Sequence, residues 1–125
     1  MRSIIKALCA SVVTASFGGM ISPAFAQKAP IDFRVVAVDR NPSSCQQFDA
    51  ALSRVHTFTP TGDAATLRTA GGVTSNMKQT TPNVFATTLG IGGTNFNVVA
   101  DASKSPKTLA VTEPRIGCRW QAVAP

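Results

Sequence analysis

VFATTLGIGGTNFNVVA, residues 84–100, is the clearest β-hairpin in this chain. Residues alternate in character on both sides of a Gly-Ile-Gly-Gly centre, which is typical of two strands joined by a tight turn, because glycine accepts positive φ without steric cost. A phosphate-binding loop is a poorer match, since the Lys-Ser/Thr pair of a P-loop is absent and a strand follows. The residues expected to face inward are Phe85, Thr87, Leu89, Phe96, Val98 and Ala100.

The same two-residue period recurs along most of the chain and predicts a mainly β protein. Glycines at 71 and 72 predict another hairpin turn. In the last strand, alternation places Ile116, Cys118, Trp120 and Ala122 on the inner face. We expect a small antiparallel β-sandwich or barrel of about seven or eight strands. The predicted strands cover residues 33–38, 55–59, 65–69, 73–79, 84–89, 94–100, 108–112 and 116–122.

One segment has a helical period instead. Cys45, Phe48, Leu52 and Val55 recur at spacings of three, four and three, which is the stripe of an amphipathic helix. A serine at 43 or 44 is a suitable N-cap. The sequence therefore predicts one short helix near the N-terminus, over residues 44–54, with Cys45 on its buried side.

The first 26 residues are typical of a secretory signal peptide that is cleaved. Arg2 and Lys6 precede an apolar stretch over residues 7–21, and Ala24-Phe25-Ala26 is a small-x-small cleavage signal before Gln27. The apolar stretch is too short for a membrane span, so no anchor is expected after cleavage. The predicted product is a single domain over residues 27–125, exported to a periplasm or to the extracellular space.

Cleavage changes the cysteine count from three to two, because Cys9 lies in the signal peptide. An even number of cysteines in a small exported chain predicts a disulfide, and two cysteines allow one pairing, Cys45–Cys118. Reactive thiol pairs usually have the close Cys-x-x-Cys spacing, which is absent. The predicted bridge is therefore structural.

The charge is mildly basic and scattered. The whole chain has twelve Lys and Arg against six Asp and Glu, and removing Arg2 and Lys6 leaves ten against six, a net charge of +4. Nucleic-acid binders usually concentrate positive charge on one face and add aromatic platforms. A nucleic-acid partner is therefore not expected.

The chain is poor in residues that carry catalysis. His56 is the only histidine, whereas zinc and copper sites usually need several histidine or cysteine ligands, so no metal and no cofactor is expected. A hydrolase could use His56 with Ser53 or Ser75, but no Gly-x-Ser-x-Gly motif is present. A hydrogen-bonded or exposed strand histidine is the simpler interpretation. The carboxylates are expected in turns or on the surface.

These observations favour a non-enzymatic exported binding or interaction module. The candidate binding face consists of outward residues on two predicted strands, Asn95, Asn97, Arg119 and Gln121. Its partner would be a protein, a glycan or a small ligand. Three alternatives stay open: a small-molecule carrier with an apolar barrel interior, a small hydrolase, and an assembly subunit that offers an unpaired strand edge.

Overall fold

The hairpin of residues 84–100 forms as its sequence predicts. In the computed structural model, which describes residues 29–124, β6 (Val84–Ile91) pairs with β7 (Thr94–Asp101). The turn is Gly92-Gly93, with φ of 57° and 81°, so β6 extends two residues further toward the turn than the sequence suggested, whereas β7 begins at Thr94 as predicted. The predicted inward residues pair across the hairpin, Phe85 with Ala100, Thr87 with Val98 and Leu89 with Phe96.

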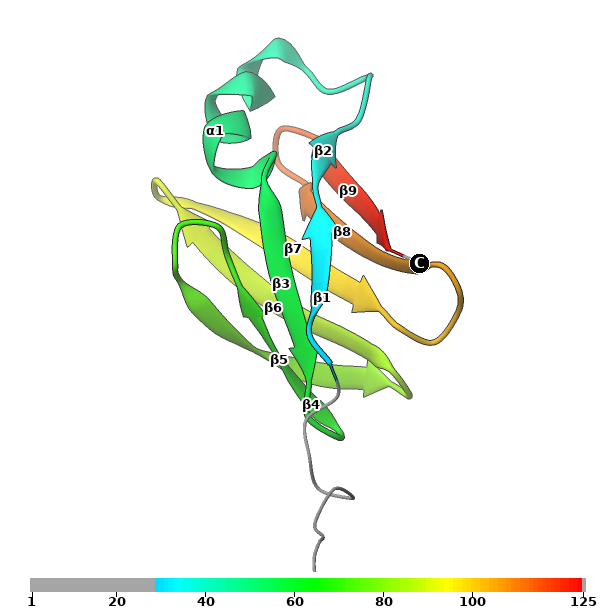
Figure 1. Cartoon of the computed structure of the whole chain (residues 1–125). Coiled ribbons are helices and arrows are strands. Elements are labelled where there is room, and N and C mark those ends of the chain that lie inside the picture. The colour runs from blue at the N-terminus through cyan, green and yellow to red at the C-terminus, as the bar shows by residue number, and fades with distance from the viewer. Residues whose placement is uncertain (1–28, 125) are drawn as a thin grey trace, which may run out of the picture.

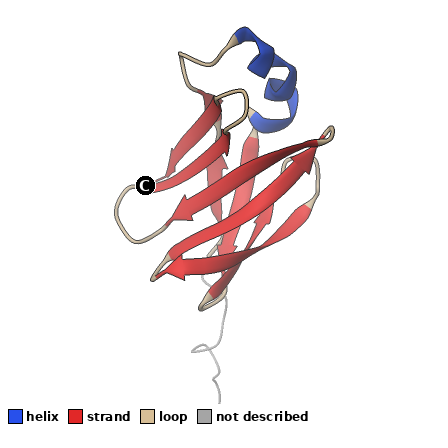
Figure 2. Ribbon diagram, turned by 180° about the vertical axis from the view of Figure 1, so that it is seen from behind, coloured by secondary structure: helices blue, strands red, loops and turns tan. Residues whose placement is uncertain are grey.

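The hairpin belongs to a nine-stranded antiparallel sheet with the order β1-β3-β4-β5-β6-β7-β8-β9-β2. The sheet curls until it is nearly closed, and the helical segment covers one of its ends (Figures 1 and 2). The mainly β prediction is confirmed. The remaining strands are β1 (Ile31–Arg34), β2 (Val36–Ala37), β3 (Val55–Pro60), β4 (Ala64–Arg68), β5 (Thr74–Thr81), β8 (Lys107–Glu113) and β9 (Cys118–Ala124).

Closure of the sheet depends on the N-terminal strands. The sequence suggested one strand over residues 33–38, but this segment changes partner near its middle: β1 pairs with β3, and β2 pairs with β9. Val35 lies between them, buried, and its N–H donates to the Arg54 carbonyl at 2.9 Å. The segment therefore connects the two ends of the sheet (Figure 1), and one expected strand becomes two.

The predicted helix is present but differs in type and length. Residues Ser43–Phe48 form a 3₁₀ helix, and Asp49–Leu52 form the single α-helical turn α1. Cys45 and Phe48 are three apart, the repeat of a 3₁₀ helix, whereas Phe48 and Leu52 are four apart, as in an α-helix. Neither serine caps the N-terminus, where Pro42 precedes the first turn without a side-chain hydrogen bond. Val55 already belongs to β3.

Aromatic side chains fill much of the interior. The rings of Phe48, Phe96 and Trp120 contact one another edge to face, with centroids 4.9 Å, 5.7 Å and 6.4 Å apart. Phe58 lies between Phe33 and Phe85, with centroids 6.3 Å and 5.5 Å away. Edge-to-face pairs contribute about 0.5–1.5 kcal/mol each beyond the area they bury. Through Phe48, the first group of rings packs the helical segment against β7 and β9.

One prediction near the last strand is wrong, and another holds only in part. Ile116 is not inward on β9 but lies in the turn that precedes it, 40% exposed, and the strand begins at Cys118. Glu113 is not a surface carboxylate: it is buried at the end of β8, where its Oε1 accepts a hydrogen bond from the Ile116 N–H at 2.6 Å. The turn needs a positive φ at Gly117, 91°, so alternation stops there.

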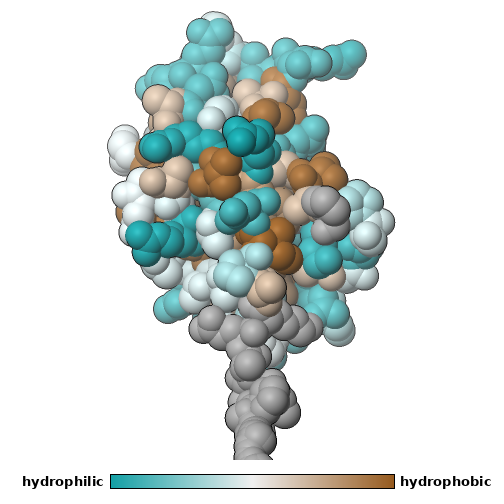
Figure 3. All heavy atoms as spheres, viewed as in Figure 1, coloured by the Kyte–Doolittle hydropathy of each residue, from teal (hydrophilic) through white to brown (hydrophobic). Residues whose placement is uncertain are grey.

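Apolar residues on the face shown in Figure 3 form separate patches among hydrophilic ones. Among residues 29–124, no helix is long and apolar enough to cross a membrane. The predicted signal peptide over residues 1–26, with its cleavage residues Ala24, Ala26 and Gln27, lies outside the described residues.

Candidate functional site

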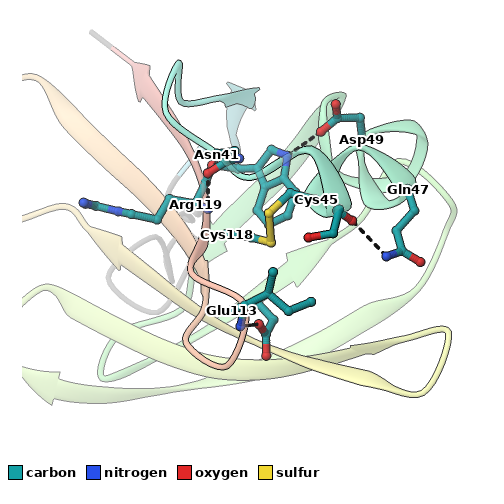
Figure 4. The surroundings of a disulfide bond; sticks show 10 residues. Asn41, Cys45, Gln47, Asp49, Glu113, Cys118 and Arg119 are labelled. Carbon is teal, nitrogen blue, oxygen red and sulfur yellow. Dashed lines mark hydrogen bonds between the residues drawn. A yellow bond between two sulfur atoms is a disulfide. The ribbon is translucent and has the colours of Figure 1, made fainter.

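The predicted disulfide is present and joins the helical cap to the sheet. Cys45, in the 3₁₀ helix, is bonded to Cys118, the first residue of β9, and their Cα atoms are 5.7 Å apart (Figure 4). Both cysteines are almost completely buried. A disulfide in a small domain is consistent with an oxidising, exported compartment.

A buried indole makes a second link between the cap and β9. Trp120 is 1% exposed, and its Nε1–H donates to Asp49 Oδ1 at 2.9 Å. Asp49 is the first residue of α1. The Asp49 carboxylate therefore accepts the hydrogen bond of the buried Trp120 N–H.

Replacing Asp49 with alanine is expected to destabilise the protein by about 1–3 kcal/mol, because the indole N–H would remain buried without an acceptor. Asp49→Asn is the matched control, since its amide oxygen can still accept the hydrogen bond. Urea unfolding followed by Trp120 fluorescence measures both variants. Equal losses for the alanine and asparagine variants would contradict this role of the carboxylate.

The loop before the cap is fixed to β9 by one side chain. Asn41 Nδ2 donates to the Arg119 carbonyl at 2.7 Å, and the Arg119 N–H donates to Asn41 Oδ1 at 2.8 Å. The Val38 N–H donates to the same carbonyl at 3.1 Å. The asparagine amide thus continues the β2–β9 pairing, while the Arg119 guanidinium points away into solvent (Figure 4).

Cross-strand register collects most of the predicted binding residues on one outer surface. Thr112 pairs with Asn97 on one side and with Arg119 on the other, which puts Asn97 and Arg119 in one row, about 10 Å apart at the usual strand spacing. Gln121 lies in the next row. We call this surface the outer face, and define it by Val36, Asn97, Val99, Ala110, Thr112, Arg119, Gln121 and Val123.

Asn95 is the one predicted binding residue that lies outside this surface. It pairs with Gly90 near the tip of the β6–β7 hairpin, beyond the row of Asn97. The structure therefore brings together Asn97, Arg119 and Gln121, and leaves Asn95 at the hairpin end.

The sequence interpretation missed the apolar part of the outer face. Val99 pairs with Ala110, Ala110 with Gln121, and Gln121 with Val36, so one row crosses four strands. Val36 is 52% exposed, Val99 40% and Val123 63%. The outward valines on alternating strands were the available signal, but their alignment depends on register between distant segments.

A shallow hollow of about 410 Å³ adjoins the outer face where β2 meets β9. Arg119 and Gln121 line it together with loop residues before the cap, including Arg40. Two arginines, two amides and the Asp39 carboxylate therefore border the same depression, next to the backbone that Asn41 fixes. This arrangement can bind polar groups, but its lining holds no candidate nucleophile.

His56 has a structural environment. It is 3% exposed, its Nδ1 accepts from the Ala70 N–H at 3.1 Å, and its Nε2 lies 3.0 Å from the Leu52 carbonyl. The first contact requires an unprotonated Nδ1, so Nε2 carries the hydrogen and donates to Leu52. Both ring nitrogens are thus engaged with backbone, and among the described residues no serine or carboxylate side chain hydrogen-bonds to the ring. The hydrolase alternative has no assembled partner for this histidine.

Among residues 29–124, no three His, Cys, Asp or Glu side chains come together in a way that could hold a metal ion. Asp101 has a lowered pKa because it accepts hydrogen bonds from the side chain and then the backbone of Ser103, with Lys104 3.9 Å away. These contacts shape the loop after β7. They lie outside the hollow beside Arg119.

Comparison of the chain with protein-family models, with curated proteins and with solved structures gives no match. The surfaces, contacts and burial of the chain itself are therefore the grounds for a functional proposal. Fold alone would not supply one, since small β-barrels serve many unrelated functions.

Proposed function

We propose that this chain is an exported, non-enzymatic binding module whose outer face contacts a partner protein. The observation that carries the proposal is the set of neighbouring rows on the outer side of β7, β8, β9 and β2. Two of these rows expose Val36 and Val99 beside Asn97, Arg119 and Gln121, and Val123 lies exposed in the row next to them.

The composition of the outer face resembles that of protein interfaces, in which apolar contact area is mixed with arginine and amide groups. Arginine is enriched among the residues that dominate binding energy. Arg119 is exposed, and the one ion pair among the described residues is Lys104–Asp101. The Arg119 guanidinium is therefore available to an acidic group of a partner.

A protein is a better fit than a glycan or a single-stranded nucleic acid. Every phenylalanine among the described residues, as well as Trp120, is buried, so the outer face offers no exposed ring on which a base can stack. Val36, Val99 and Val123 provide aliphatic contact area, which suits apolar side chains of a protein. The +4 charge of the predicted mature chain favours an acidic patch on that protein.

The rigidity of the surrounding structure also supports a binding role. Disulfide-linked Cys118 precedes Arg119, and the Trp120–Asp49 hydrogen bond follows it. Since these contacts lie on the inner side of β9, they hold the backbone while the outer side chains remain accessible. A surface fixed in this way loses little conformational entropy on binding.

Arg119→Glu is expected to weaken partner binding by about tenfold or more, because it reverses the one formal charge among the residues that define the outer face. The variant should fold, since Arg119 is bonded to Asn41 only through its backbone. Arg68→Glu, an exposed arginine on β4, is the matched control and should bind normally. Capture from the exported fraction of the native cell, quantified by mass spectrometry for all three proteins, measures the effect. Retention of the same partner by Arg119→Glu, or equal loss with Arg68→Glu, would refute the proposal.

A further inference from the structure

A second recessed surface lies under α1, at the end of the barrel that the helical cap covers. Its volume is about 270 Å³, and it shares no residue with the outer face. Residues from α1, from the start of β3, from the turn between β4 and β5 and from the end of β6 line it. They are Ala51, Leu52, Arg54, His56, Thr69, Gly71, Val73, Leu89, Gly90 and Ile91, and we call this surface the cap groove.

The cap groove exists because β5 and β6 separate toward this end. Their pairing runs from Thr81↔Val84 only as far as Lys78↔Ala86. By contrast, β4 and β5 stay paired to Arg68↔Thr74, and β6 and β7 to Ile91↔Thr94. Between the two hairpin tips the sheet is therefore open, and Leu89, which is 5% exposed, lines the groove there.

The chemistry of the cap groove is apolar with one positive charge. Leu52, Leu89 and Ile91 give aliphatic walls. Both nitrogens of His56 are already bonded to backbone, so the histidine contributes a ring surface and no free polar atom. The lining contains no carboxylate, and its single formal charge is that of Arg54.

The rim carries unpartnered apolar surface. Val73 is 60% exposed, although it lines the cap groove beside the turn between β4 and β5. An alkyl chain lying over Val73 and Leu89 would remove this surface from water, which stabilises the bound state. Arg54, in the same lining, supplies a guanidinium that could pair with a negative group on such a chain.

We propose that the cap groove binds a free fatty acid of medium length, with the alkyl chain along Leu52, Leu89 and Val73 and the carboxylate at Arg54. The available volume equals about nine water molecules at roughly 30 Å³ each. A methylene group is of similar size, so a chain of about eight to ten carbons fits. The proposal is independent of the outer face, and either can fail without the other.

The direct test is titration of ¹⁵N-labelled mature protein, residues 27–125 with the disulfide formed, with decanoate below its micelle concentration. Amide signals of Gly71, Val73 and Gly90 are expected to shift in a saturable way, whereas those of Arg119 and Gln121 stay in place. Octanoate should bind more tightly than hexanoate by about threefold to fourfold per methylene. Decyltrimethylammonium, which has the opposite charge, should bind more weakly than decanoate.

Two substitutions with matched controls locate the ligand. Arg54→Gln should weaken decanoate binding about twofold to fivefold and abolish the preference for a negative head group. Arg68→Gln, an exposed arginine outside the cap groove, should do neither. Val73→Asn should weaken binding of both amphiphiles, while Val123→Asn, at 63% exposure on the outer face, should leave it unchanged.

Several outcomes would overturn the proposal. One is the absence of saturable shifts at Gly71, Val73 and Gly90 with decanoate. Another is equal affinity for decanoate and decyltrimethylammonium in the unmodified protein. If an extended apolar peptide with a free carboxyl terminus displaced decanoate at far lower concentration, the cap groove would be a peptide site and not a fatty-acid site.

Discussion

Removal of the Cys45–Cys118 bridge, by Cys45→Ala together with Cys118→Ala, is expected to lower the free energy of unfolding by about 2–5 kcal/mol. The bridge spans a sequence separation of 73 residues, and in the chain-entropy model a loop of this size contributes roughly 4 kcal/mol. Both sulfur atoms of the bridge belong to buried core residues, so alanine leaves unfilled space. For a domain with a total stability of about 5–15 kcal/mol, this loss is large.

Urea unfolding followed by the fluorescence of Trp120, the only tryptophan, provides the measurement. The indole packs against Phe48 of the cap and therefore reports when the cap leaves the sheet. Gln46→Ala, an exposed neighbour of Cys45 in the same helix, is the control and should change the midpoint little. An unchanged midpoint in the double-alanine variant would show that the cap is held without the bridge.

The second large effect is expected at His56. His56→Ala should destabilise the protein by about 2–3 kcal/mol, because the partly buried Ala70 N–H loses its acceptor, the Leu52 carbonyl keeps only the Arg54 N–H as a donor, and a cavity remains. His56 connects the end of α1 to the turn between β4 and β5. Loss of the imidazole ring should therefore also loosen α1 and the turn between β4 and β5, which are two walls of the cap groove.

Hydrogen exchange of the Ala70 amide, together with urea unfolding, measures this effect. His56→Gln is the conservative variant, since its amide can donate and accept one hydrogen bond each, and it should recover part of the stability. Asn76→Ala, an exposed substitution on β5, is the neutral control. If His56→Ala were as stable as the unmodified chain, the ring would be free for catalysis and the hydrolase alternative would gain support.

Most of the secondary structure could be predicted from short-range patterns in the sequence. The hairpin of residues 84–100 was predictable because alternation and the Gly-Gly turn act within one segment. The Cys45–Cys118 pairing followed from counting the cysteines outside the predicted signal peptide, and the spacings of Cys45, Phe48 and Leu52 gave the position of the cap. These features depend on local backbone geometry, or, for the disulfide, on the fact that two cysteines allow one pairing.

Long-range register accounts for what the sequence did not predict. The sequence interpretation did not single out Val36 or Val99, because their place in one outward row depends on the pairing of four strands. The strand change at Val35 and the separation of β5 from β6, which opens the cap groove, have the same origin. Ile116 was misplaced because alternation continued through a turn that Gly117 creates with its positive φ.

The central claim, that the outer face is a contact surface for a partner protein, is tested most directly by site-specific photo-crosslinking in the native cell. A photoreactive residue replaces Gln121, the middle of the row that connects Val99 with Val36, and a second protein carries it at Asn76, exposed on β5. The expected result is one discrete crosslinked partner at Gln121, lost when Arg119→Glu is added, and none at Asn76. Crosslinks of equal yield at both positions, or none at Gln121, would contradict the claim.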